Sequence, residues 1–334
     1  MNKPMLLREC EIKSHWKVIL ALDWADRLGN APKRVFDFIY EFSKQIHISV
    51  EPISLITDQT QVEQQSSTHL RNIPIEEFQD RVKRSLNLAS PHVVSELKTL
   101  EIGSHRMSQA IDTLHNEAVR RRADLIVTAT HGRQGWQRLI HSSFVEGLLL
   151  NSRIPVLSVG PQFKHPRAIQ HILFPTNLTQ ESRKVLRKMI PLICALRARV
   201  TLFHSLPTPR DQEPSHHIVS FHKAKPKLPG AWQSDLEKHE EQAQTFVDAI
   251  TSAGGKADIF LDSSGMDLIQ AIEDYLNITH VDMIATTAQS GPISNYFNGM
   301  TTRKLVRTSS CPVLLLHQNP APSIQSSAEE KPAA

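Results

Sequence analysis

The sequence predicts an α/β protein built from two tandem copies of a doubly wound, five-stranded parallel-sheet domain. Short, almost continuous apolar runs alternate with longer amphipathic segments, which is the pattern of parallel strands buried between helices. The alternation then begins again after a polar stretch at 160–170 that contains two prolines. A length of 334 residues is sufficient for two such domains.

The first copy opens with an apolar strand that ends in the acid Asp23, and apolar residues at helical spacing follow it. Pro52 within the second strand indicates an irregular or edge position, because proline cannot donate to a sheet ladder. The predicted strands are 17–23, 48–56, 93–102, 124–128 and 155–159. The predicted helices are 34–46, 75–88, 108–122 and a last one in the apolar stretch 144–150.

The second copy repeats this order at nearly constant offsets. Asn177 lies 154 residues after Asp23, and Pro312 lies 157 residues after Pro155. Such offsets predict duplication of one unit. We expect domains at 1–163 and 164–317 and a disordered tail at 318–334, which is mainly Pro, Ser, Ala, Gln and Glu. The predicted strands are 171–177, 198–206, 256–262, 281–286 and 312–316, the predicted helices are 180–196, 235–252 and 266–276, and a polar loop is expected at 207–232.

Composition excludes several classes of protein. No apolar run approaches the roughly 20 residues of a membrane-spanning helix, so no membrane partner is expected. The three cysteines are far apart without metal-ligand spacing, which predicts a reducing, cytoplasmic setting. The formal charge of +4 is modest, and no specific nucleic-acid partner is predicted.

The stretch 123–161 has the arrangement of a phosphate site. An apolar strand is followed by a loop containing Gly132, then by a helix start and another apolar strand. A glycine after a parallel strand lets the backbone approach a ligand closely, and a helix start offers free N–H groups to an anion. In a doubly wound sheet, ligands bind beyond the carboxyl ends of the strands where the winding reverses.

This stretch resembles the signature of the universal stress protein superfamily, Gly-x2-Gly-x9-Gly-Ser/Thr. The matching positions are Ala129, Gly132, Ser142 and Ser143, so the spacing is kept while small residues replace the first and third glycines. The resemblance implies the strand order 3-2-1-4-5, an adenine nucleotide α-hydrolase-like fold, and ATP, with Mg²⁺, as the ligand.

By this resemblance, Asp23 accepts a hydrogen bond from the adenine or ribose, while Ala21, Leu22 and Ile53 line the adenine pocket. The alternative is that Asp23 is a turn or capping acid and that the three apolar residues belong to the core. The candidate nucleotide contacts are Ala21, Leu22, Asp23, Ile53, Thr128, Ala129, Gly132, Arg133, Ser142, Ser143 and Phe144.

The phosphates would lie against Gly132, Arg133 and the serine pair Ser142 and Ser143. Gly132 is also explained by a turn that needs positive φ, and Arg133 by a solvated loop. Ser143 and Glu146 have the spacing of a capping box, which accounts for the serine without a ligand.

The second copy departs from the signature. Asn177 replaces the acid, Met300 takes the hydroxyl position, and only eight residues separate Ser290 from Gly299. We therefore expect weak or absent nucleotide binding there, with the copy kept for packing.

The resemblance also implies an assembly, since universal stress protein domains commonly dimerise through their last strands. Here the strands 155–159 and 312–316 would pair within one chain, and whole chains could dimerise further. The leading hypothesis is a cytoplasmic stress-response module that binds an adenine nucleotide in its first domain. A slow ATPase and a nucleotide-free scaffold are the alternatives; no general base is evident for the former.

Overall fold

The computed structural model describes residues 13–23, 30–57, 75–89, 95, 97–102, 107–130, 147–148, 152–206, 218–220, 230–288 and 299–317. Its strands are β1 (Trp16–Asp23), β2 (Ile48–Thr57), β3 (Lys98–Ile102), β4 (Leu125–Ala129), β5 (Val156–Val159), β6 (His171–Pro175), β7 (Arg199–Ser205), β8 (Ile218–Ser220), β9 (Lys256–Asp262), β10 (Met283–Ala288) and β11 (Val313–His317). Its helices are α1 (Asn30–Gln45), α3 (Ile75–Ala89), α4 (Met107–Arg120), α6 (Gln180–Leu196), α7 (Gly230–Thr251), α8 (Leu268–Ile278) and α9 (Gly299–Thr308).

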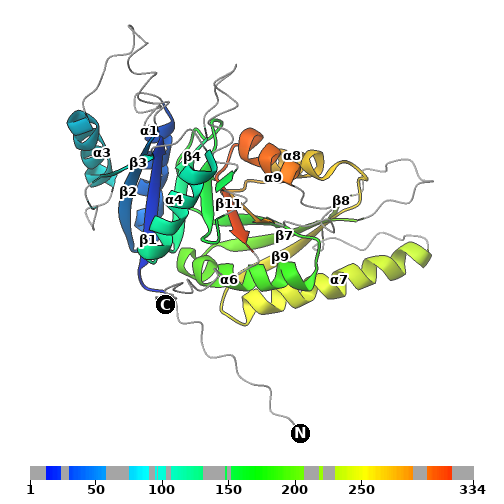
Figure 1. The fold of residues 1–334 in the computed structure, drawn as a ribbon. Coiled ribbons are helices and arrows are strands. Elements are labelled where there is room, and N and C mark those ends of the chain that lie inside the picture. The colour runs from blue at the N-terminus through cyan, green and yellow to red at the C-terminus, as the bar shows by residue number, and fades with distance from the viewer. Residues whose placement is uncertain are drawn as a thin grey trace, which may run out of the picture.

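The strands form one sheet in the order β3-β2-β1-β4-β5-β11-β10-β6-β7-β9-β8 (Figure 1). Each copy contributes five parallel strands in the order 3-2-1-4-5, as predicted. The sequence did not predict β8, which pairs antiparallel with β9 inside the stretch expected to be a loop. The fold class predicted from the sequence is therefore confirmed, with one added edge strand in the second copy.

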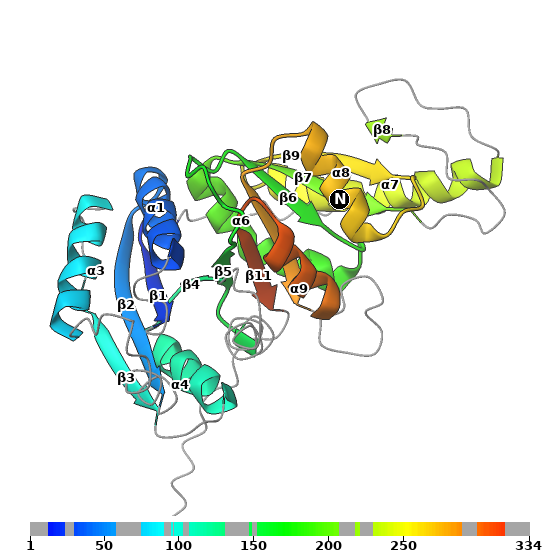
Figure 2. The ribbon, with the colours of Figure 1, turned by 90° about the horizontal axis from the view of Figure 1, so that it is seen from above.

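Helices cover both faces of this sheet, as doubly wound domains require. The core of one face contains side chains of α1, α3, α6 and α7, and the core of the other face contains side chains of α4, α8 and α9. Each core includes residues of both copies, so the two copies share a continuous interior. Figure 2 shows β5 and β11 side by side where the copies meet.

The two copies repeat individual hydrogen bonds as well as elements. The carboxylate of Asp124 accepts from the backbone N–H of Lys17 at 2.8 Å, and that of Asp282 accepts from the N–H of His171 at 2.9 Å. Each aspartate precedes the fourth strand of its copy and ties it to the start of the first. These aspartates therefore have a structural role.

The turn before the last strand is also built twice in the same way. Ser152 donates its hydroxyl hydrogen to the carbonyl of Ile154 at 2.9 Å, and Ser309 donates to the carbonyl of Cys311 at 3.0 Å. Cys311 thus takes the place of a buried isoleucine, and its side chain serves the core.

Contacts beyond the cores also join the copies. In the structure, β5 and β11 pair antiparallel, with Leu157 opposite Leu314. At the end of α1, the Gln45 amide accepts from the Ile169 N–H at 2.7 Å and donates to the Leu196 carbonyl at 3.4 Å. One side chain of the first copy therefore contacts both the linker and a helix end of the second.

Gly160, just after β5, lies against the end of α9 of the second copy. A Cβ atom at this position would lie 3.2 Å from the carbonyl oxygens of both Val306 and Ser309, at the end of α9. The absence of a side chain at Gly160 therefore lets the linker pass beside α9.

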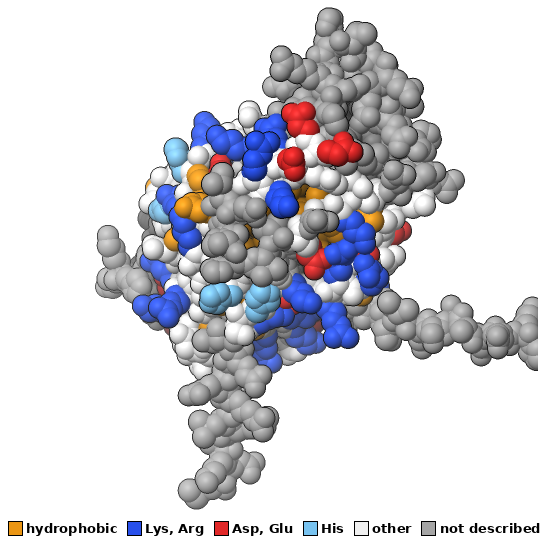
Figure 3. Space-filling model, turned by 90° about the vertical axis from the view of Figure 1, so that its left-hand side faces the viewer, with side chains coloured by type: hydrophobic (Ala, Val, Ile, Leu, Met, Phe, Trp, Pro, Cys, Tyr) orange, Lys and Arg blue, Asp and Glu red, His pale blue; other side chains and the backbone are white. Residues whose placement is uncertain are grey.

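The surface on the α3 side of the molecule carries more basic than acidic side chains (Figure 3). This distribution agrees with the formal charge of +4. Within the described part of the chain, no helix has the length and apolar character needed to cross a bilayer.

Candidate functional site

The carboxyl ends of β1 and β4 lie side by side in the first copy. Ala21 is the register partner of Thr128, and the strand order reverses between these two strands. The structure therefore forms the switch point at which ligands bind in doubly wound sheets.

The predicted adenine-pocket residues are all buried, but they do not share one face. Ala21 and Ile53 are register partners and lie in the core beneath α4. Leu22 points to the other face and packs in the core with Val35 of α1. Packing alone accounts for the Leu22 side chain, whereas Ala21 and Ile53 lie together beside the switch point.

The end of β4 is held firmly at the place where the predicted phosphate loop begins. The Thr128 side chain is buried, and Ala129 is half-buried. The next residue, Thr130, is also buried, and its N–H donates to the Val159 carbonyl at 3.0 Å. The loop therefore starts from a fixed backbone position.

Arg34 adds a cationic side chain at this position. Its guanidinium Nη2 donates to the Thr130 carbonyl at 2.9 Å, in a partly buried contact between α1 and the end of β4. Arginine keeps its charge under all ordinary conditions and binds phosphate well. The guanidinium thus contacts the backbone of the predicted phosphate loop, between Ala129 and Gly132.

The start of α1 reinforces this positive character. The helix begins with Asn30 at the carboxyl edge of the sheet, and its first turn contains no acidic side chain. A helix N-terminus has partial positive charge, which stabilises a nearby anion. These groups therefore suit a negatively charged ligand such as a nucleotide phosphate.

The remaining predicted contacts lie outside the described residues. This applies to the side chain of Asp23, which is the last residue of β1, and to Gly132, Arg133, Ser142, Ser143 and Phe144. Their part in the site stays a prediction.

At the corresponding place in the second copy, Asn177 takes part in a capping network. Its side-chain oxygen accepts from the hydroxyls of Thr179 and Ser182, at 2.9 and 2.6 Å. Thr179 is the N-cap of α6, and its hydroxyl oxygen accepts from the Ser182 N–H. The position of the predicted acid is therefore used to start a helix.

Two histidines lie side by side near the carboxyl end of β7, the neighbouring strand of the second copy. His204 donates from Nδ1 to the Thr176 carbonyl at 2.9 Å, so its Nε2 accepts from Nδ1 of His239, also at 2.9 Å. The two rings stack with their centroids 4.7 Å apart. Burial lowers the pKa of His204 to about 4, so the ring is neutral near pH 7.

The described residues contain no group of three or more side chains placed to hold a metal ion. Cys194 and Cys311 are free thiols, and Cys10 lies outside the described residues. The loop histidines His216, His217 and His222 carry no described side chains.

Sequence reasoning missed Arg34. Its contact with Thr130 spans 96 residues, so no local pattern shows it. One signal was available, because the helix after the first strand of such a sheet must begin at the ligand edge. A basic residue in the first turns of that helix is therefore a candidate for anion binding.

Comparison with known proteins agrees with this architecture. Residues 52–160 and 168–317 each match the Universal stress protein family. No curated protein sequence matches the chain.

Among solved structures, the chain is similar to a universal stress protein from Archaeoglobus fulgidus DSM 4304, with a TM-score of 0.53 and 14% identity over 90% of this chain and 96% of the other. It is also similar to a functionally unknown protein from Pseudomonas aeruginosa PAO1 and to a putative universal stress protein from Pseudomonas aeruginosa UCBPP-PA14. Both have TM-scores of 0.55 and 14% identity over 90% of this chain and 92% of theirs. At this identity the similarity establishes the fold. Since the family match extends over both copies, the chain belongs to the universal stress protein family.

Proposed function

We propose that this protein binds ATP, or a related adenine nucleotide, with Mg²⁺ in its first copy and acts as a cytoplasmic regulatory module of the stress response. The observation that carries the proposal is the Arg34 guanidinium at the Thr130 carbonyl, beside a helix start that has no acidic residue in its first turn. Both features favour an anion at the switch point of the sheet.

The proposed arrangement assigns the two ends of the nucleotide to different parts of this edge. The adenine lies against Ala21 and Ile53, with the Leu22 backbone beside it, and Asp23 accepts a hydrogen bond from the adenine or ribose. The phosphates lie along the chain from Thr128 to the next helix, and their proposed contacts are Thr128, Ala129, Gly132, Arg133, Ser142, Ser143 and Phe144.

The second copy, at 164–317, is proposed to bind no nucleotide and to serve as a packing partner for the first, at 1–163. The involvement of Asn177 in the α6 cap supports this division. We also propose that the β5–β11 pairing persists in solution and that whole chains associate as dimers.

Equilibrium dialysis with Mg²⁺ and ATP tests the proposal. We expect one ATP per chain, and we expect Gly132→Val to weaken binding by at least about tenfold, because a branched side chain would occupy phosphate space. Ser290→Val, at the matching position of the second copy, is the control and should leave binding unchanged.

Absence of bound adenine nucleotide at millimolar concentration would remove the ligand from the proposal and favour a nucleotide-free scaffold. Steady ADP release that disappears in Gly132→Val would favour an ATPase. Thermal stabilisation by ATP is the supporting readout, because a ligand of the folded state raises stability.

A further inference from the structure

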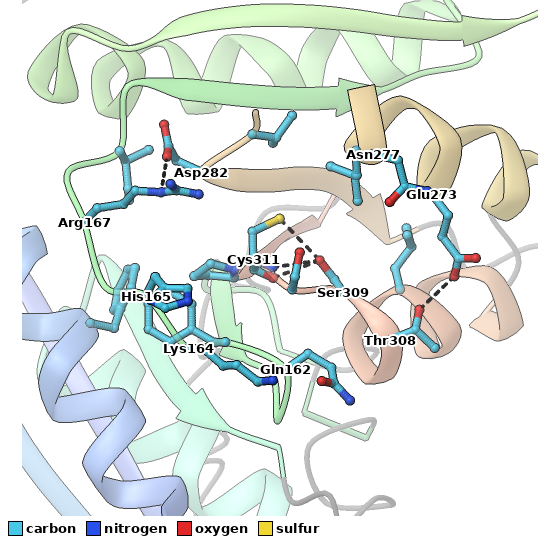
Figure 4. A pocket seen from close by; sticks show the side chains of 18 residues that line it. Gln162, Lys164, His165, Arg167, Glu273, Asn277, Asp282, Thr308, Ser309 and Cys311 are labelled. Atoms are coloured by element: carbon cyan, nitrogen blue, oxygen red, sulfur yellow. Dashed lines mark hydrogen bonds and ion pairs between the residues drawn. The ribbon is translucent and has the colours of Figure 1, made fainter. Parts of the chain in front are cut away.

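A pocket lies at the amino ends of β10 and β11. Because β11 runs antiparallel to β5, this pocket is on the same edge of the sheet as the carboxyl ends of β1 and β4, on the side of the second copy. Its volume is about 560 Å³, within the range of small-molecule sites. One wall is the linker between the copies, and the other is formed by the ends of α8 and α9 (Figure 4).

The linker wall is held in place by the first copy. The Phe163 ring packs edge-on against Phe38 of α1, with centroids 6.3 Å apart. At the other end of this wall, the Ile169 N–H donates to the Gln45 side chain at 2.7 Å. The Lys164 side chain between these two anchors is exposed and has no hydrogen-bond or ion-pair partner among the described residues.

The opposite wall is negative. Glu273 of α8 lies there, and its carboxylate accepts a hydrogen bond from the Thr308 hydroxyl at 3.2 Å. Both α8 and α9 end at this wall, at Ile278 and Thr308, and a helix C-terminus has partial negative charge. A cationic group is therefore favoured on this side.

Arg167 and Asp282 also line the pocket, but they satisfy one another. Arg167 Nε lies 2.9 Å from the Asp282 carboxylate, which also accepts from the Gln170 and His171 N–H groups. Lys164 and Glu273 thus remain as opposite charges on opposite walls (Figure 4).

The surface between the two charged walls is largely apolar. It includes Phe163, Ile169, Leu276 and Pro312. Burial raises the pKa of the Cys311 thiol to about 11, so this side chain is neutral and acts as a small apolar group. This surface suits a hydrophobic side chain.

The first copy lacks this charge arrangement. By the offsets of the duplication, His115 and Arg153 stand where the second copy has Glu273 and Ser310. The acidic wall is therefore specific to the second copy, and the linker wall exists only because the copies are joined.

We propose that this pocket binds a small zwitterion of the amino-acid class with a large apolar side chain. Its carboxylate pairs with Lys164, its ammonium group faces Glu273 and the two helix ends, and its side chain lies on the apolar surface between them. A ligand with a single charge pairs with only one of Lys164 and Glu273 and leaves the other charge without a partner in the ligand.

Isothermal titration calorimetry of the full chain with phenylalanine tests this inference. We expect millimolar or tighter binding, and we expect Lys164→Gln and Glu273→Gln each to weaken it by about tenfold, the typical worth of a charge-assisted hydrogen bond. Lys184→Gln, an exposed lysine of α6 away from the pocket, is the matched control and should leave binding unchanged.

Two analogues test the charge pattern. Phenylacetate lacks the ammonium group and phenethylamine lacks the carboxylate, so both should bind at least about fivefold more weakly than phenylalanine. Equal binding of phenylacetate and phenylalanine, binding unchanged in Lys164→Gln, or no binding of phenylalanine at 10 mM (roughly −2.7 kcal/mol) would each overturn the inference. Circular dichroism of every variant establishes that it is folded.

Discussion

At the scale of single residues, the proposed role of Arg34 in binding the nucleotide phosphates can be tested directly. Its guanidinium contacts the Thr130 carbonyl at the end of β4. If the nucleotide lies there, the charge of Arg34 stabilises the phosphates and its hydrogen bond fixes the start of the loop.

We predict that Arg34→Gln weakens ATP binding by about tenfold, the typical effect of losing one charge-assisted hydrogen bond. Lys33→Gln, at the neighbouring exposed position of α1, is the control. Dialysis with both variants measures the effect, and equal affinities would show that Arg34 has no part in binding. A wild-type protein without ATP affinity would instead refute the proposed function itself.

The buried His204 predicts how the free energy of unfolding depends on pH. Its pKa is lowered to about 4 by burial, compared with about 6.5 in an unfolded chain. Between these values the unfolded state binds a proton that the folded state does not. The free energy of unfolding therefore falls as the pH falls from 6.5 to 4, by about 3 kcal/mol in total from this residue.

Urea unfolding at pH 7, 5 and 4 should show this loss in the wild type. His204→Gln should reduce the dependence on pH, because the amide donates to the Thr176 carbonyl without titrating. His165→Gln, on the exposed linker, should retain the wild-type dependence. An identical pH profile in wild type and His204→Gln would contradict the assignment.

Arg34 and Gln45 show which part of the structure a sequence cannot supply. Their contacts join segments 96 and 124 residues apart, and only the folded arrangement brings those segments together. In contrast, Ala21, Ile53 and Thr128 could be placed at one edge from the strand pattern alone, since strand ends define that edge. Leu22 was predicted to line the adenine pocket together with Ala21, and its side chain lies in the core of the other face, because neighbouring residues of a strand face opposite sides.

At the scale of elements, the apolar periodicity located most helices and strands to within a few residues. α6 and β9 have the predicted bounds, because caps and turn residues border clear apolar patterns. β8 was missed, since its three residues have little pattern of their own and pair with β9. α7 begins at Gly230, five residues before the predicted start and within the polar stretch 207–232 that was predicted to be a loop.

Pro52 was predicted at an irregular or edge position, and β2 proves to be an interior strand. The β2–β3 ladder begins at Ile53, one residue after the proline. Pro52 therefore lies just outside that ladder, where the missing N–H is tolerated.

The aspartate before each fourth strand is expected to stabilise the fold, and its substitution tests this at the scale of elements. Asp282→Asn removes the charge that holds the Gln170 and His171 N–H groups and Arg167. We expect the free energy of unfolding to fall by about 2 kcal/mol, because hydrogen bonds to a buried charged group contribute more than neutral ones. Urea denaturation measures this.

Asp124→Asn offers a matched comparison in the first copy, where the same backbone bond is present. It should destabilise the protein in the same direction. A change below about 0.5 kcal/mol in both variants, the range of ordinary surface substitutions, would show that these aspartates do not hold the sheet together.

At the scale of the whole molecule, both cores contain residues of the two copies, and β5 pairs with β11. We therefore predict that the copies unfold together in one cooperative transition. Fluorescence and circular dichroism should give coincident urea curves, and hydrogen exchange should show similar limiting protection for β1 and β6. Two separated transitions would show that the copies are thermodynamically independent.

The β5–β11 ladder has one further consequence. In a dimer of separate chains, such a ladder forms only above a threshold concentration, and dilution dissolves it by mass action. Here the peptide linker keeps the two strands at a high local concentration, however scarce the protein is. In a dimer of identical chains, a substitution appears in both subunits. Here each copy has its own stretch of sequence, so a substitution in one copy leaves the other copy unchanged.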